Sequence, residues 1–558
     1  MKFLAITILV SLTIPSFSQT PIDESAKIVD FCKVWGFLKY HHPSVAKGRY
    51  DWDREFIVNI KMIEQLKSKE EVNKFYYEWI SGLGKLKKQR KRDLPPGAIL
   101  DNYDFKWLKD TTVFTNQVTE LLLLTQNNSG AKNHYVKRKF FGLAAPSYIN
   151  EAPYKDSIYP SSEMRLLLLS RYWNIVNYFY PYKYLTDTNW QDVLNEFVPK
   201  FINANNLKNY HLTLLELFAK LNDSHTGFDS RLYNSFHKVP PFNCKIVDDK
   251  IIVLYAQNDS ICKKYDIRYG DVILKVNGKS VKSLIDYYSN YIPASNYTSL
   301  CKKLTSSYLG AGVLDSAVVS CERDGHVFDK TLPAYSTYPS LEHYLAVKKK
   351  PLPKTKNINY KINKNNIAYI NLGKVNSKKE MEEALEQIQN TDGVILDLRN
   401  YPNSSIFSTV TNFFCTSKKP FVKIAKHSIK YPGTLFWSKT ISCGNNSGKK
   451  YKGKVVVLID ENTMSFAEYF TMALKTISNV ILIGSHTAGA DGGNHHFILP
   501  GNIITSFSNE GVYYPNGDET QRKGIIPDIT VLPTIEGIRL MKDEAFAKAL
   551  DILNLTKN

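Results

Sequence analysis

After its first 20 residues, the 558-residue chain has no apolar run that could cross a bilayer, since a spanning helix needs about 20 predominantly apolar residues. It also lacks the Cys and His spacing of zinc sites, a Walker phosphate loop and an aromatic RNA-binding signature. These absences argue against a membrane-spanning protein and a nucleic-acid-binding protein. We expect no metal and no organic cofactor.

Acidic residues are fewer than basic ones: 53 Asp and Glu against 72 Lys and Arg give a formal net charge of +19. Such an excess would suit nucleic acid or an anionic membrane surface. The basic runs at 85–92 and 347–356 are short, however, and typical of solvated loops or linkers. Because no nucleic-acid motif accompanies them, we expect no nucleic-acid partner.

The first 18 residues are typical of a secretory signal peptide. An apolar stretch from Phe3 to Ile14 is followed by small residues, and Ser16-Phe17-Ser18 fits a cleavage site. The mature chain would then begin near Gln19, and the protein would be periplasmic or extracellular.

Cysteine is scarce and odd in number, with seven residues in all. Export permits disulfides, and four of the seven fall between positions 244 and 321. We expect one or two bridges in that segment, without a deducible pairing.

Two segments of the N-terminal half resemble each other. The sequence KVWGFLKYHHP at 33–43 parallels RYWNIVNYFYP at 171–181, and apolar residues recur at helical spacing in both. This predicts a helical repeat region at 19–150 and a second helical unit at 151–235. Only the second unit ends in a polar Asp-Ser-His sequence, which contains Ser224 and His225.

The next segment has the residue pattern of a small β domain. A hairpin with an Asp-Asp turn is predicted at 244–256, followed at 265–288 by a turn, a strand, an Asn-Gly turn and a helix. This order resembles a PDZ-like domain, which we place at 236–335. The matching residues are Ile267, Gly270, Asp271, Ile273, Asn277 and Gly278. Such domains bind extended peptides by adding a strand to a sheet edge.

A linker is expected at 336–360, and strands then alternate with helices through 361–552. The predicted strands are 366–373, 393–400, 454–460 and 479–484, and the predicted helices are 377–389 and 409–416. This alternation indicates an α/β layer with parallel strand pairing.

Ser465 stands where the apolar run KVVVLID gives way to a predicted helix, with Glu468 three residues later. Ser-x-x-Glu is the capping-box pattern, so a structural cap explains the pair on its own. A nucleophile would suit the same place, because the free N–H groups and partial positive charge of a helix N-terminus can stabilise an oxyanion. The two roles share one geometry.

Taken in order, DSHTGF, the PDZ-like segment, GVILDLRN, VVVLIDENTMSFAEYF, VILIGSHTAGADGG and QRKGIIPDITVLPT resemble the C-terminal processing (tail-specific) serine peptidases, in the branch similar to the tricorn core. The resemblance covers roughly residues 153–550. It implies a multidomain α/β protein with a ClpP/crotonase-like β/α peptidase core, a PDZ-like domain and N-terminal helical repeats. The implied function is a secreted serine endopeptidase that acts on polypeptides.

The resemblance also implies roles for residues around the nucleophile, Ser465. The N–H of Phe466 would be one oxyanion donor, and the backbone near Asn400 and Tyr401 would supply another. The loop there reads RNYPNSS, which is stiffer and bulkier than the Gly-rich loop of the family. Tail-specific members use a Lys in the turn that here reads TAGADGG, with Ala490 in the place of the Lys, so a Ser–Lys dyad is not expected.

Tricorn-type members take their base from an upstream Ser-His pair, which Ser224 and His225 match. A His has a suitable pKa for taking the proton of a hydroxyl. The rival bases are His486, His495 and His496, of which His486 is the strongest because it directly precedes the TAGADGG turn.

Tricorn-type sites add a late carboxylate, for which Glu519 is the candidate, although a solvated turn would explain this residue nearly as well. Asp397 and Arg399 are expected to brace a strand end. The alternative function is a catalytically inactive peptide-binding protein on the same fold, which the altered turn and loop keep open. An α/β-hydrolase is disfavoured because no Gly-x-Ser-x-Gly elbow surrounds Ser465.

Overall fold

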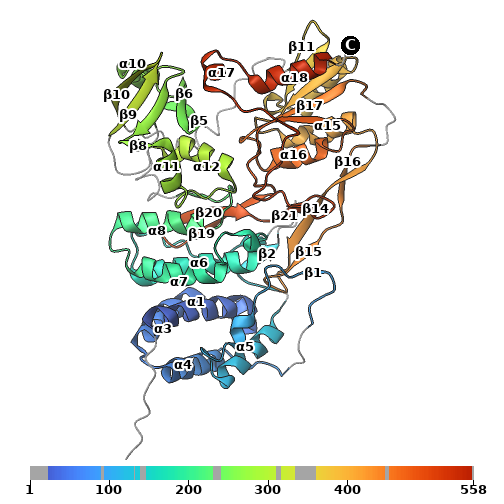
Figure 1. The fold of residues 1–558 in the computed structure, drawn as a ribbon. Coiled ribbons are helices and arrows are strands. Elements are labelled where there is room, and N and C mark those ends of the chain that lie inside the picture. The colour runs from blue at the N-terminus through green and yellow to red at the C-terminus, as the bar shows by residue number, and fades with distance from the viewer. Residues whose placement is uncertain are drawn as a thin grey trace, which may run out of the picture.

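The computed structural model describes residues 23–88, 93–130, 132–138, 146–229, 240–309, 316–333, 360–445 and 451–555. The expected signal peptide lies outside these residues, and so does the expected linker except for Tyr360. Figure 1 shows three blocks: stacked helices from the N-terminal part, a smaller sheet with helices from the middle, and an α/β block from the C-terminal part.

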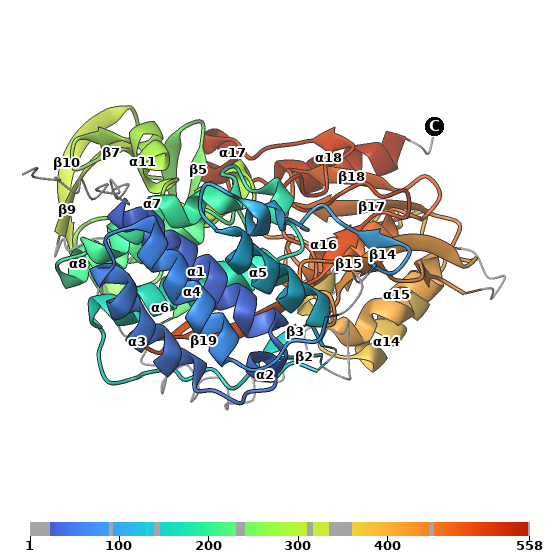
Figure 2. The same ribbon diagram turned by 90° about the horizontal axis from the view of Figure 1, so that it is seen from below.

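The first block is mainly helical, with three short strands. Its elements are α1 (Glu24–His41), α2 (Pro43–Ala46), α3 (Trp52–Gln65), α4 (Lys69–Gly82), β1 (Ala98–Ile99), α5 (Asn116–Asn128), β2 (Val136–Arg138), β3 (Pro146–Tyr148), α6 (Ser162–Phe179), α7 (Trp190–Ile202) and α8 (Leu207–Ala219). Helix α1 packs against α6 and α7, so the two sets of helices share one apolar core. Figure 2 shows this block from below, with α1, α3 and α4 toward the viewer.

The two helical units repeat one hydrogen-bonded pair. Trp35 Nε1 donates to Trp52 O at 2.9 Å, and Trp52 Nε1 donates to Trp35 O at 3.1 Å. Trp173 and Trp190 form the same reciprocal pair at 2.8 and 3.1 Å. Each pair ties a long helix to the first residue of a following helix. The internal repeat predicted from the sequence is therefore confirmed at the level of single hydrogen bonds.

The middle block holds an antiparallel sheet in the order β10-β9-β7-β6-β5, with β8 paired to β7. Its elements are β5 (Phe242–Val247), β6 (Lys250–Ala256), α10 (Asp259–Lys264), β7 (Val272–Val276), β8 (Lys279–Ser280), α11 (Val281–Tyr288), α12 (Tyr297–Lys303), β9 (Ser316–Arg323) and β10 (His326–Pro333). Asp248 and Asp249 make the β5–β6 turn with φ of 50° and 54°. Asn277 and Gly278, at φ of 49° and 76°, make the next turn. Both predicted turns are confirmed.

The α/β block is built on a sheet in the order β11-β12-β13-β17-β18-β22, which is parallel from β12 onward. Its elements are β11 (Tyr360–Ile362), β12 (Ile367–Asn371), α14 (Lys378–Ile388), β13 (Gly393–Asp397), α15 (Phe407–Phe414), β17 (Lys454–Ile459), α16 (Phe466–Leu474), β18 (Ile481–Gly484), β22 (Ile529–Thr530), α17 (Ile535–Arg539) and α18 (Glu544–Asn554). The predicted parallel α/β layer is confirmed.

Both faces of this sheet are covered. Along β17, Val455 and Val457 pack into the cluster that contains α14, α15 and α16. The intervening Val456 and Leu458 pack into the cluster that contains α18. A strand buried on both faces requires apolar residues at every buried position, which explains the unbroken VVVLI run at 455–459.

Further strands join the blocks: β4 (Phe228–Asp229), β14 (Lys419–His427), β15 (Leu435–Trp437), β16 (Ile441–Cys443), β19 (Asn494–Leu499), β20 (Ile503–Ser508) and β21 (Gly511–Tyr513). Strand β4, which follows α8 near the end of the second helical unit, pairs antiparallel with β20, so that Asp229 faces Ile504. Continued toward the end of β20, this register sets His225 opposite Ser508. Figure 1 shows β19 and β20 between the helices and the α/β block.

The cysteines, all within the described residues, are free thiols. The disulfides expected between 244 and 321 are therefore absent from the structure. Two of the thiols there point at backbone carbonyls instead: Cys244 Sγ at Thr305 O and Cys262 Sγ at Pro241 O, at 3.9 and 3.3 Å.

Over the described ranges, no helix combines the length and the apolar character that a bilayer crossing requires. In the same part of the chain, no group of three or more His, Cys, Asp or Glu side chains is arranged to hold a metal ion.

Candidate active site

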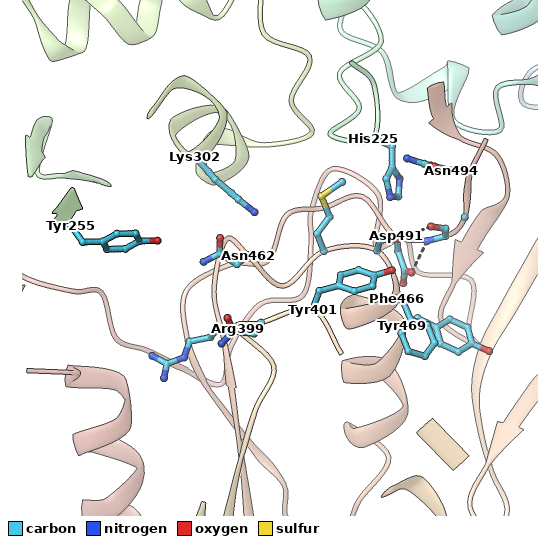
Figure 3. Close-up of a pocket in the computed structure, with 15 residues that line it drawn as sticks. His225, Tyr255, Lys302, Arg399, Tyr401, Asn462, Phe466, Tyr469, Asp491 and Asn494 are labelled. Carbon is cyan, nitrogen blue, oxygen red and sulfur yellow. Dashed lines mark hydrogen bonds between the residues drawn. The ribbon is translucent and has the colours of Figure 1, made fainter. Parts of the chain in front are cut away.

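A cleft of about 1000 Å³ opens at the carboxyl ends of β13, β17 and β18. Parallel α/β sheets commonly place their sites at this edge. Five of the residues predicted from the sequence line the cleft: Ser465, Phe466, Asn400, Tyr401 and His225. Figure 3 shows His225 above the start of α16, with Lys302 reaching in from the other side.

Ser465 directly precedes α16 and has an unusual backbone, with φ of 58° and ψ of −123°. A residue with a Cβ pays of order 1–3 kcal/mol for such a conformation. The conformation is held because the Ser465 N–H donates to Ala490 O at 3.0 Å and to Glu468 Oε2 at 3.1 Å. The hydroxyl donates to Gly492 O at 3.1 Å, on the cleft wall. A helix cap does not require a half-buried serine in a strained backbone conformation that hydrogen bonds of its own N–H hold in place.

Glu468 fastens the TAGADGG turn to the start of α16. Its fully buried carboxylate accepts hydrogen bonds from Gly489 N at 2.8 Å, from Ala490 N at 3.1 Å and from the Thr487 hydroxyl. Burial raises its pKa to about 7. Ala490 is also fully buried, so the turn supports Ser465 through its backbone.

His225 is 8% exposed and enters the cleft from the loop between α8 and β4. Its Nδ1 lies 2.8 Å from Ser508 Oγ, and its backbone N–H donates to Asp223 Oδ1 at 3.0 Å. Burial lowers the pKa of the imidazole, against the opposing effect of the Asp223 charge. A His with a lowered pKa is neutral near pH 7 and can accept a proton.

Two predicted catalytic residues are not on the cleft wall. Ser224 bonds through its backbone N–H to Ser295 Oγ at 2.8 Å and through its hydroxyl to Ala488 O at 3.3 Å. It therefore braces the His225 loop against the turn below Ser465. The Glu519 carboxylate accepts a hydrogen bond from the Tyr184 hydroxyl at 2.6 Å. The carboxylate that touches the His225 backbone belongs to Asp223.

The rival bases lie elsewhere. His486 is exposed, and neither it nor His496 is among the described residues that line the cleft. His496, on β19, is near enough to His225 to lower its pKa. This arrangement favours His225 over His486 as the partner of Ser465.

Arg399 and Asp397 brace the end of β13. Arg399 Nη2 lies 2.8 Å from Asp397 Oδ2 and 2.7 Å from Asp543 Oδ2. The expectation for this pair is confirmed. The bracing fixes the base of the loop that carries Asn400 and Tyr401.

Sequence reasoning missed two titratable residues on the cleft wall, Lys302 and Asp491. Burial and the nearby Glu468 raise the pKa of Asp491 well above its ordinary value. Its Oδ1 accepts from Gly492 N at 2.6 Å. Asp491 could have been found from the sequence, because it directly follows Ala490 in the TAGADGG turn. Lys302, on α12, had none, because only the fold brings the middle block to the cleft.

Comparison with known proteins agrees with this geometry. Residues 366–531 match Peptidase family S41. The carboxy-terminal processing protease CtpA of Bacillus subtilis (strain 168) is 25% identical over 332 residues, which cover 57% of this chain and 62% of CtpA. A probable CtpA-like serine protease of Staphylococcus aureus (strain N315) is 25% identical over 292 residues, which cover 51% of this chain and 50% of that protein.

The fold has a counterpart among solved structures. Mature CPAF complexed with lactacystin superposes with a TM-score of 0.54 at 15% identity, over 71% of this chain and 98% of CPAF. This likeness supports a multidomain α/β fold resembling that of CPAF, in a chain that has an N-terminal helical region. Ser465 and its supporting turn lie inside the matched region, so the part of the chain that forms the cleft at α16 is similar to the serine-type peptidases of family S41.

Proposed function

We propose that the protein is an exported serine endopeptidase that hydrolyses polypeptides through an acyl-enzyme on Ser465, with His225 as the general base. The observation that carries this proposal is that Ser465 and His225, far apart in the sequence, line one cleft. The strained backbone of Ser465 and the neutral state of His225 are what a nucleophile and its base need.

In the first step, the Ser465 hydroxyl oxygen attacks the substrate carbonyl carbon while His225 takes the hydroxyl proton. The carbonyl oxygen becomes an oxyanion. The Phe466 N–H lies in the first turn of α16, whose N–H groups have no acceptor within the helix, and the loop at Asn400 and Tyr401 lies across the cleft.

The tetrahedral intermediate then collapses. The C–N bond breaks, and His225 gives its proton to the leaving amine, which leaves an ester on Ser465. A water molecule repeats the sequence: His225 removes its proton, the water oxygen attacks the ester, and the serine oxygen leaves with the returned proton.

The finer architecture belongs to the same proposal. We assign residues 361–552 to a ClpP/crotonase-like core, 236–335 to a PDZ-like domain, 151–235 to the second helical unit and 19–150 to the helical repeat region. Cleavage after Ser18 would deliver the protein to a periplasm or the exterior. What supports the PDZ-like assignment is the five-strand order with a paired β8 and its two turns.

The test is reaction with a fluorophosphonate probe, which forms a covalent bond with activated serines. We expect labelling of the wild-type protein, no labelling of Ser465→Ala, and hydrolysis of casein-like substrates by the wild type alone. Absence of labelling in a folded wild-type protein would favour the alternative, a peptide-binding protein without catalysis.

A further inference from the structure

Three buried residues form a continuous hydrogen-bonded chain behind the ring of His225. Ser508, at the end of β20, lies with its Oγ 2.8 Å from His225 Nδ1 and 3.1 Å from Asp223 Oδ1. The Ser508 backbone N–H also donates to Asp223 Oδ2 at 2.6 Å. Asp223 and Ser508 are both fully buried, so water does not compete for these bonds.

The protons in this chain can be counted. An ionised carboxylate only accepts, so the single hydroxyl proton of Ser508 is donated to Asp223. The Ser508 oxygen must then accept from His225, which requires the imidazole proton to sit on Nδ1. A neutral imidazole has one N–H, so Nε2 carries the lone pair.

We propose that Asp223 and Ser508 are positioning residues that hold His225 in the tautomer with a basic Nε2. This inference rests on the proposed function, in which His225 takes the proton of Ser465. Asp223 acts at one remove, through the Ser508 hydroxyl, where other serine hydrolases place a carboxylate directly on the histidine.

The surroundings of the ring fit this role. The charged or titratable groups that act on His225 are Asp223, Lys303 and His496. Lys303 donates to Thr226 O at 2.9 Å and to Pro293 O at 2.6 Å, so it holds the loop beside the ring. Asp223 is the only acid among the three, and so it stabilises the imidazolium that forms during the reaction.

The kinetic test compares Ser508→Ala with two further variants. Ser508→Thr keeps the hydroxyl. Ser506→Ala is the matched control, because Ser506 lies on the same strand and its hydroxyl donates to the His225 backbone O at 2.8 Å rather than to the ring.

Because a general base contributes about 10²–10⁴-fold, we expect Ser508→Ala to lower kcat roughly 10²-fold with little change in KM. The acid limb of its pH–rate profile should move to lower pH, since the imidazolium loses its stabilising partner. Ser508→Thr should recover most of the rate, and Ser506→Ala should keep it. Equal losses in Ser508→Ala and Ser506→Ala would overturn the inference.

A second measurement does not depend on activity. Nitrogen-15 NMR of histidine-labelled Ser465→Ala protein, with His225→Gln to assign the signal, reads which ring nitrogen carries the proton. We expect Nδ1–H in this background and a changed tautomer ratio on adding Ser508→Ala. A proton on Nε2 instead of Nδ1 would overturn the inference and leave the serine mechanism standing. A proton on Nδ1 together with no probe labelling of the wild-type protein would refute the peptidase alone.

Discussion

At the scale of single residues, the backbone conformation of Ser465 leads to a prediction about stability that the hydroxyl group alone does not give. With φ of 58° and ψ of −123°, any residue with a Cβ is strained there, and glycine is not. We expect both Ser465→Ala and Ser465→Gly to lack peptidase activity. Ser465→Gly should unfold with a free energy about 1 kcal/mol higher than Ser465→Ala, after the entropic cost of glycine. Thermal melting of the two variants checks this, and a more stable Ser465→Ala would contradict it.

The second prediction at this scale concerns the pH dependence of the base. Burial lowers the pKa of His225 below its ordinary value of 6.5, so the neutral, active form persists below that pH. Activity should therefore fall on acidification through a midpoint below pH 6.5, and not on the alkaline side. The pH–rate profile for a short peptide measures this midpoint.

Substitutions identify the group whose titration causes this fall in activity at low pH. His225→Ala should remove most of the rate, while Lys475→Ala should not, because Lys475 ends α16 and points its ammonium at the Tyr514 ring, 5.8 Å away. A larger loss in His486→Ala than in His225→Ala would refute the base assignment.

At the scale of elements, the start of α16 depends on a carboxylate that cannot be replaced by an amide. Each oxygen of Glu468 accepts from two donors, so the NH₂ of a glutamine would face the N–H groups of Ser465 and Ala490 in one orientation and the Gly489 N–H in the other. We expect Glu468→Gln to lose roughly 2–4 kcal/mol of stability and most of the activity, because each buried donor left unpaired costs about 1–3 kcal/mol. Thr471→Val, which removes a hydroxyl bonded within α16, is the control.

The same substitution should change the pH dependence of stability. The folded-state pKa of Glu468, about 7, lies above the ordinary 4.5, so the folded protein binds this proton more tightly than the unfolded chain. The contribution is therefore present below pH 4.5 and is lost as the pH rises toward 7. Glu468→Gln should flatten this part of the curve, as denaturant unfolding at several pH values would reveal. An unchanged slope would assign the titration to the neighbouring Asp491.

Helices and strands with a regular pattern of apolar residues were predictable from the sequence. The contacts in the site between residues far apart in the sequence were not. The β17 strand and the α16 helix follow from an apolar run and a capping pattern, and the position of Ser465 follows from them. The partner of the His225 ring does not: Ser508 is 283 positions away and is brought there by a β4 strand of two residues. Glu519 was predicted from a family pattern rather than from a contact, and that pattern gave no reason to consider Asp223.

At the scale of the whole molecule, α17 is one of the elements that hold the middle block beside the cleft. Tyr269 Oη donates to Ile538 O at 2.6 Å, and Arg539 Nε donates to Gly270 O at 3.1 Å. We expect Tyr269→Phe combined with Arg539→Ala to slow cleavage of a long unfolded protein more than that of a short peptide, if the block recruits substrate by strand addition.

The control for that comparison is Arg268→Ala, which removes an exposed arginine paired with Asp266 inside the same block. The ratio of rate losses on the two substrates is the quantity to measure. Equal losses would mean that the block supports the cleft rather than delivering peptide, and the recruitment role would be withdrawn.

The pairing of β4 with β20 also has a consequence for the newly made chain before it folds. During synthesis the segment with His225 emerges well ahead of Ser465, and Ser508 follows last of the three. Until that late strand is in place, the histidine and the serine are ordinary polar side chains on an open polypeptide. The order of the sequence therefore leaves Ser465 without a positioned histidine until the segment that carries Ser508 has been made.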